Sequence, residues 1–105
     1  MVKDVDIQNF ESEVLNNSGV TVVDFYADWC GPCRKLSPIL EEVEGELCER
    51  ANFAKINTDE NIDVAREYQV SGLPTLLVFK DGQVVERMVG LMPKSSILTN
   101  IEKHL

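Results

Sequence analysis

The stretch Val20-Thr21-Val22-Val23-Asp24-Phe25-Tyr26-Ala27-Asp28-Trp29-Cys30-Gly31-Pro32-Cys33 decides the fold of this chain. Its first part is mostly β-branched and aromatic at both odd and even positions, which is typical of a strand covered on both faces. Two cysteines three positions apart follow, where the pattern changes to that of a helix. Residues at this spacing in the first turn of a helix lie on one side, within disulfide range. The stretch therefore predicts a reversible dithiol at a strand-to-helix junction.

The segment after the cysteines predicts an amphipathic helix that packs on this strand. Its apolar side chains recur at 3.6 residues per turn, and glutamates are distributed over the remaining surface. Pro38 lies inside the helix and removes one backbone donor, which predicts a kink near the helix start. The apolar stripe consists of Leu36, Ile39, Leu40, Val43 and Leu47.

The remaining segments predict an α/β fold, with a central mixed sheet and helices on both faces. Asp6 is a candidate N-cap for a first helix that carries Ile7, Phe10, Val14 and Leu15. The pair Asp81-Gly82 predicts a tight antiparallel turn. The expected elements are helices at residues 7–15 and 59–70, strands at 20–27, 51–57, 75–79 and 83–89, and a closing helix after Pro93.

Two of these helices are expected to pack through a few apolar side chains each. In the helix at 59–70 we expect Ile62, Ala65 and either Tyr68 or Val70 to face inward. The closing helix would bury one apolar face on the sheet. Its apolar positions are Ile97, Leu98, Ile101 and Leu105.

Length and composition predict one soluble domain spanning residues 1–105, because 44% of the residues are hydrophobic and supply a single core. The net charge of −8 opposes binding to phosphate backbones and anionic membranes. The chain starts without an apolar signal core, and no stretch approaches the roughly 20 apolar residues that cross a bilayer. Three cysteines are an odd number and argue against a secreted disulfide scaffold. We therefore expect a cytoplasmic protein with neither nucleic acid nor membrane as partner.

The two motif cysteines are expected to have different roles. Cys30 would face unpaired backbone amides and the positive end of the helix dipole, which stabilise a thiolate. Cys33 lies one turn into the helix, near the apolar stripe, and is expected to be the more shielded sulfur. Cys30 would thus attack a substrate disulfide, and Cys33 would then attack the Cys30 sulfur and release reduced substrate. Gly31 is expected to permit a tight turn into the helix and Pro32 to stiffen it.

Asp24 is a carboxylic acid inside an otherwise apolar strand, where it requires a partner or a proton. One interpretation places it at an outward edge position or makes it a paired surface acid. The other makes it a buried acid of raised pKa that accepts and returns the Cys33 proton. Lys55, in the strand at 51–57, is its candidate partner.

The side chains next to the cysteines leave further alternatives open. Trp29 forms an apolar wall that faces substrate, or part of the core, or both with different faces of its ring. Arg34 and Lys35 either add positive potential at the dithiol or point to solvent. Sequence alone predicts only a turn at Pro74.

Residues 24–33, together with several downstream positions, resemble the thioredoxin family over nearly the entire chain. The sequence of residues 29–33 in this strand-to-helix context is specific evidence for the family, whereas two cysteines at this spacing alone would be weak evidence. The resemblance implies the thioredoxin fold, protein-disulfide reductase activity on client proteins and recharging by a thioredoxin reductase, with the dithiol as the redox group and no cofactor or metal. The downstream positions are Pro38, Lys55, Gly72-Leu73-Pro74-Thr75, Gly82 and Gly90.

The resemblance also implies a substrate groove beside the dithiol. Pro74 would follow a cis peptide bond, and Leu73 before it would pair with the client backbone. Family members commonly have a β-branched residue at that position. Leu73 departs from this pattern, which affects the expected preference for client peptides and not the expected activity. The groove residues would be Trp29, Gly31, Pro32, Leu73, Pro74 and Gly90.

Other functions are weighed against this one. An isomerase or oxidase of the same fold is less consistent with Gly-Pro between the cysteines. A metal-binding module would use both motif cysteines together with Cys48 and His104, but the last two lack the close spacing of zinc-knuckle ligands. Cys48 is instead expected to be a buried or half-buried inert thiol, with regulatory oxidation as the alternative. His104 is expected to be a cation at a helix C-terminus. A binding module would use the dithiol only as a switch. We expect a monomeric redox carrier.

Overall fold

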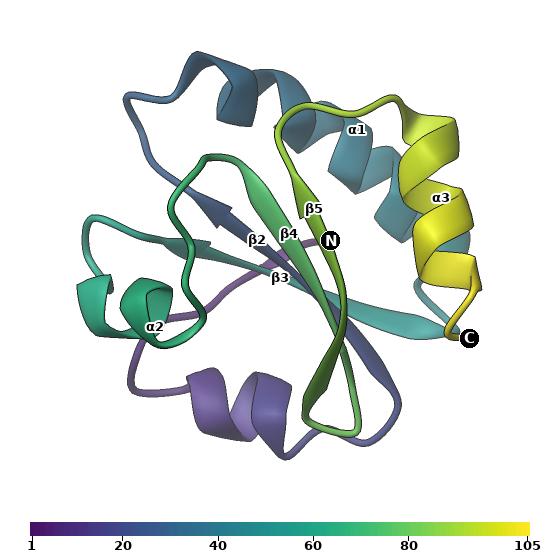
Figure 1. Ribbon diagram of the computed structural model, residues 1–105. Coiled ribbons are helices and arrows are strands. Elements are labelled where there is room, and N and C mark those ends of the chain that lie inside the picture. The colour runs from purple at the N-terminus through teal and green to yellow at the C-terminus, as the bar shows by residue number, and fades with distance from the viewer.

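The computed structural model describes all 105 residues and contains a five-stranded mixed sheet (Figure 1). The strand order is β1-β3-β2-β4-β5; β3 is parallel to both β1 and β2, and β4 is antiparallel to both β2 and β5. No helix is long and apolar enough to span a bilayer. The elements are β1 (Lys3–Asp4), η1 (Glu11–Leu15), β2 (Val20–Tyr26), α1 (Gly31–Leu47), β3 (Ala51–Asn57), α2 (Ile62–Glu67), β4 (Thr75–Lys80), β5 (Gln83–Val89) and α3 (Lys94–Glu102).

Helices cover both faces of this sheet, which confirms the predicted fold class. Figure 1 shows α1 and α3 on one side of the strands and η1 and α2 on the other. The core accordingly has two large clusters, one on each face, besides a small one of three residues at the cysteines. Successive side chains of a strand point to opposite faces, so β2 supplies Val20 and Val22 to the α1 face, and Val23 and Phe25 to the α2 face. β2 is therefore the central, doubly covered strand that its composition predicts.

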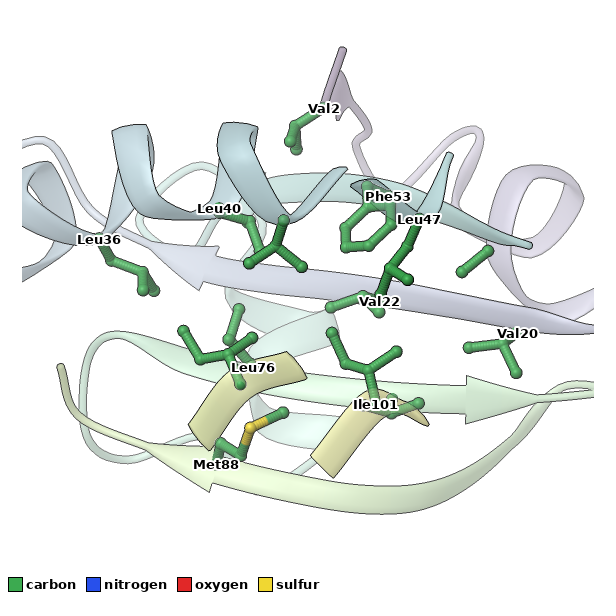
Figure 2. Packing of buried hydrophobic residues seen from close by; sticks show 14 residues of the cluster. Val2, Val20, Val22, Leu36, Leu40, Leu47, Phe53, Leu76, Met88 and Ile101 are labelled. Carbon is green, nitrogen blue, oxygen red and sulfur yellow. The ribbon is translucent and has the colours of Figure 1, made fainter. Parts of the chain in front are cut away.

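Helix α1 lies on the sheet through the predicted apolar stripe. Figure 2 shows Leu36, Leu40 and Leu47 pointing from this helix toward the side chains of the strands. Ile39 lies at the margin of the stripe and is only partly buried. Pro38 lies inside the helix, as predicted. The stripe holds the long helix whose first turn carries the two cysteines.

The N-terminal segment differs from the predicted helix at residues 7–15. The chain first forms β1, whose two residues are too few to show a periodicity in sequence. Asp6 caps the following turn as expected, because its Oδ1 accepts hydrogen bonds from the N–H groups of Gln8 and Asn9. Ile7 is exposed, and the buried side of the segment begins at Phe10. The expectation that Ile7 belongs to the apolar side is therefore wrong.

Helix α2 is shorter than the predicted segment at 59–70. The Asn57 side chain accepts a hydrogen bond from the Asp59 N–H, so the chain turns before it becomes helical. At the other end, Gln69 has a φ of 56° and stops the helix. Val64 is the buried residue of α2, whereas Ile62 is exposed, contrary to expectation.

Strands β4 and β5 form the predicted hairpin. Asp81 and Gly82 both have positive φ values, 51° and 81°, which is the signature of a type I′ turn. The turn packs against the N-terminal half of the chain, because an added Cβ at Gly82 would lie 2.5 Å from the Leu15 carbonyl oxygen. Helix α3 then closes the α1 face with Ile97 and Ile101 fully buried, as predicted.

Candidate active site

Cys30 and Cys33 form a disulfide at the N-terminus of α1, with their Cα atoms 5.2 Å apart. Cys30 is the N-cap residue and has an extended backbone. Its sulfur accepts a hydrogen bond from the Cys33 N–H at 3.2 Å. Pro32 occupies the first helical turn, where a missing N–H leaves no bond unmade. The helix start therefore places a free backbone amide at the Cys30 sulfur, where it stabilises negative charge.

The two cysteines are equally buried in this disulfide form. Each is 4% exposed, and the two share one small cluster with Ala27. Tyr26 and Leu73 pack against the cluster. In this disulfide form the exposed fractions do not distinguish Cys33 as the more shielded residue, and both cysteines pack under the same neighbours.

Gly31 has a different role from the one expected. Its φ does not lie in the positive region, and an added Cβ would meet only the Arg34 Nη2 atom, at 4.0 Å. Glycine is therefore not required for a tight turn at this position. Its missing side chain instead leaves open surface beside Cys30.

Asp24 lies on the α1 face of the sheet, in a row of side chains that crosses several strands. It is paired in register with Lys55 of β3 on one side and with Leu76 of β4 on the other. It is 4% exposed, and its Oδ1 atom has no hydrogen-bond partner. Burial raises the pKa of Asp24 from 3.8 to about 7, and the positive charge of Lys55 opposes this shift. Asp24 is thus a buried acid, and an outward position is excluded.

Lys55 is a neighbour of Asp24 but does not form an ion pair with it. Its Nζ atom is 4.0 Å from Oδ1 of Asp4 and 6.0 Å from the centre of the Tyr26 ring. Lys55 therefore acts on Asp24, whose candidate partner it is, through its charge and without an ion pair. The long lysine side chain carries its ammonium toward the solvent edge, where it stays hydrated.

A cavity of about 170 Å³ connects the buried acid with the dithiol. Such a space accommodates water, which can carry a proton between polar groups. Asp24 and Cys33 both line it. The other lining residues are Tyr26, Ala27, Asp28, Arg34, Ser37 and Lys55.

The loop before β4 lies beside the cysteines. The Leu73–Pro74 peptide bond is cis, as the family resemblance implies. Because β4 runs antiparallel to β2, with Thr75 opposite Phe25, this loop meets the end of β2 from which the dithiol follows. Gly90 donates its N–H to the Pro74 carbonyl at 2.8 Å, so the loop after β5 lies there too. Its φ of 92° favours glycine.

Trp29 lies on the surface, and the core interpretation is excluded. Trp29 is 69% exposed, and its indole Nε1–H donates a hydrogen bond to Asp59 Oδ2 at 2.8 Å. No spacing in the sequence indicates this pair, because it depends on how the β3–α2 turn meets the dithiol loop. Arg34 donates to the Asp28 carbonyl oxygen at 2.7 Å, and both Arg34 and Lys35 are exposed.

The structure does not bring together the residues of the alternative metal module. Cys48 is the C-cap of α1 and Cys30 its N-cap, so the helix of 17 residues separates them by about 27 Å along its axis. Nε2 of His104 lies 2.9 Å from a Glu86 carboxylate oxygen. Cys48 is exposed, and the expectation of a buried or half-buried thiol is wrong because the apolar stripe ends at Leu47.

Together, the fold and the dithiol site define a dithiol–disulfide oxidoreductase. The thioredoxin family model matches residues 1–103. The chain is 49% identical to a thioredoxin of Chlamydia pneumoniae over 99% of both chains. It is 45% identical to thioredoxin 2 of Chlorobaculum tepidum over 93% of this chain and 90% of that protein. A thioredoxin of Staphylococcus saprophyticus is 46% identical over 92% of this chain and 91% of its own.

The chain belongs to the thioredoxin family. It is therefore a protein-disulfide oxidoreductase, and its redox group is the disulfide of its own Cys30 and Cys33. As in the family generally, its partners are disulfide-containing client proteins and a reductase.

Proposed function

We propose that the protein is a general protein-disulfide reductase in which Cys30 is the nucleophile and Cys33 the resolving thiol. The N-cap position of Cys30, with the Cys33 amide at its sulfur, carries this assignment. In the reduced protein the Cys30 thiolate attacks one sulfur of a client disulfide, forms a mixed disulfide and expels the other client sulfur as a thiolate. Cys33, as a thiolate, then attacks the Cys30 sulfur and expels the second client sulfur. Two electrons pass to the client, and each expelled thiolate takes up a proton.

Asp24 is proposed to accept the proton that Cys33 must lose before it attacks. The two residues line the same cavity, which is large enough to hold a water molecule that carries the proton between them. A general base works best when its pKa lies near the working pH, and burial raises the pKa of Asp24 to about 7. Lys55 is proposed to tune this acid, because its charge opposes the shift.

The client is proposed to bind in the groove between the dithiol and the cis-proline loop. Trp29, which directly precedes Cys30 in the chain, is an exposed apolar residue. Leu73 packs on the cysteine cluster, which supports the proposal that its backbone pairs with an extended client segment. The complete set of proposed groove residues is Trp29, Gly31, Pro32, Leu73, Pro74 and Gly90.

The cellular setting is likewise proposed. The protein would work as a monomer in the cytoplasm, reduced by a thioredoxin reductase, with neither nucleic acid nor membrane as partner. The net charge of −8 supports the last two points. Oxidised protein should be reduced by NADPH and a thioredoxin reductase, and sedimentation should give the mass of one chain.

Turnover of a protein disulfide with dithiothreitol as electron source tests the chemical assignment. With the unmutated protein, called the parent below, reduction should be much faster than with dithiothreitol alone. Both Cys30→Ser and Cys33→Ser should lose this rate increase. The two variants are matched controls for each other. Only Cys33→Ser should accumulate a covalent client adduct, which mass spectrometry detects. An adduct on Cys30→Ser instead would reverse the roles, and a parent no faster than dithiothreitol would favour the binding module.

A further inference from the structure

The row of side chains that contains Asp24 extends one strand further, to Asp4. The register pairs Asp4 of β1 with Lys55 of β3, and Lys55 with Asp24 of β2. Side chains alternate between faces along a strand, and Val2, two residues before Asp4, belongs to the core under α1. Asp4, Lys55 and Asp24 therefore lie side by side on the same face of the sheet.

Backbone pairing fixes Asp4 beside the lysine. β1 consists of Asp4 and one other residue, and the next residue, Val5, donates its N–H to the Lys55 carbonyl at 2.9 Å. The Asp4 carboxylate is 76% exposed and is 4.0 Å from the Lys55 ammonium. The strand thus ties a hydrated carboxylate next to the cation that faces the cavity.

Lys55 lies between two carboxyl groups and contacts only the outer one. Its ammonium pairs with Asp4, while the Oδ1 atom of Asp24 has no hydrogen-bond partner. A cation stabilises an ionised carboxyl more strongly as the distance falls. The position of the Lys55 ammonium therefore sets how strongly Asp24 is favoured in its charged form.

The other groups around Asp24 leave Lys55 as the cation that acts on it. The positive charge that shifts the pKa of Asp24 is that of Lys55. Arg34 also lines the cavity, but its guanidinium is bound to the Asp28 carbonyl oxygen. β4 faces Asp24 with the apolar Leu76. The titratable and charged groups around Asp24 are Asp4 from β1, Tyr26 from β2, Asp28 from the loop after β2, Lys55 from β3, and Cys33 and Arg34 from α1.

We propose that Asp4 is a positioning residue for the dithiol reaction, because its carboxylate holds the Lys55 ammonium at the solvent edge of the cavity and so preserves Asp24 as a proton carrier. This inference rests on the proposed role of Asp24. It adds that Asp4, in the edge strand β1 and outside the cavity lining, influences the pKa of Asp24. Removal of the Asp4 charge frees the ammonium to approach Asp24 and to favour the ionised acid.

The test is an NMR titration of the Asp24 carboxyl carbon in the oxidised protein. In Asp4→Asn the titration midpoint should fall by on the order of half a pH unit, as expected for release of an exposed ion pair. Asp4→Glu, which keeps the charge, should restore most of the parent midpoint. Glu11→Gln is the matched control, since it removes the same charge from an exposed position in η1 on the other face.

A double-mutant cycle shows whether Asp4 acts through Lys55. In a Lys55→Met background the Asp4→Asn change should move the Asp24 midpoint by less than a quarter of its effect in the parent; Lys55→Gln replaces this background if the first does not fold. An equal shift in both backgrounds, or no shift in Asp4→Asn, overturns the inference. The titration needs no turnover, so loss of the proposed function itself is judged separately, from the activity of Asp24→Asn.

Discussion

Asp24 carries an acid into the interior of the sheet, and its burial opposes the stability of the fold at neutral and alkaline pH. With a pKa raised from 3.8 to about 7, the folded state keeps a proton that the unfolded chain has already lost between these two values. The unfolded state binds fewer protons in that window, so the free energy of unfolding falls as the pH rises through it. Stability from this group is complete below about pH 4 and is lost above pH 7.

Asp24→Asn should therefore stabilise the oxidised protein at pH 8, by at most about 4 kcal/mol, and should have little effect near pH 4. Urea denaturation at the two pH values measures the difference. Thr21→Val is the control, because the Thr21 hydroxyl is also buried without a hydrogen-bond partner but does not titrate. Its gain, on the order of 1 kcal/mol, should be the same at both pH values. A pH-independent gain in Asp24→Asn would exclude titration of the carboxyl as the cause.

Single residues also show what could be predicted at the site. The dithiol and the buried acid were recognisable because a motif spacing and a carboxyl in an apolar run are local signals. The Trp29–Asp59 bond and the Asp4–Lys55 pair were not, because they join segments through strand register and turns. Lys55 was predicted as the partner of Asp24, and its charge acts on that acid, but pairing in register does not fix where the ammonium of a long side chain lies.

The elements divide in the same way between local and tertiary causes. The predicted bounds of β3 and β5 agree with the structure, since alternation and the Asp81-Gly82 turn define them locally. Helix α2 was overextended because a side-chain bond from Asn57 shortens it, and β1 was missed because it exists only through pairing with β3. Hydrophobic patterns therefore predicted the layers of the fold, while side-chain caps and strand pairing set the ends of the helices and strands.

The β4–β5 turn gives a prediction at this scale. Gly82→Ala should destabilise the protein by about 3 kcal/mol or more, because it combines a positive φ with a Cβ 2.5 Å from the Leu15 carbonyl oxygen. Gly19→Ala is the matched control: its φ is also positive, at 88°, but the new Cβ meets nothing within 4 Å. It should lose only about 1–2 kcal/mol. Equal losses in urea denaturation would mean that the contact with Leu15 relaxes freely.

The whole molecule is expected to unfold as one cooperative unit, as the single domain predicted from length and composition implies. The two core clusters share β2, so neither can melt without exposing the other. Calorimetry of the oxidised protein should give one transition, with a calorimetric enthalpy equal to the van't Hoff enthalpy. Two transitions, or loss of one helix pair before the other in hydrogen exchange, would contradict this prediction.

Charge gives the second prediction at this scale. The net charge of −8 should attract cationic disulfides to the molecule and repel anionic ones, and the acidic residues Asp28, Asp59 and Glu60 lie close to the dithiol loop. Reduced protein should therefore react faster with cystamine than with dithiodipropionate. The ratio of the two rates should fall as salt is raised from about 10 to 500 mM. A ratio that does not change with salt would exclude a long-range electrostatic cause.

The exposed indole beside the cysteines has a practical consequence. Trp29 is the one tryptophan of the chain, and it is held in the dithiol loop by its bond to Asp59. Intrinsic fluorescence excited at the indole band therefore originates entirely from this loop. The protein carries its own optical reporter, so docking of a client, formation of a mixed disulfide and release of product can be followed in a stopped-flow instrument without any attached dye.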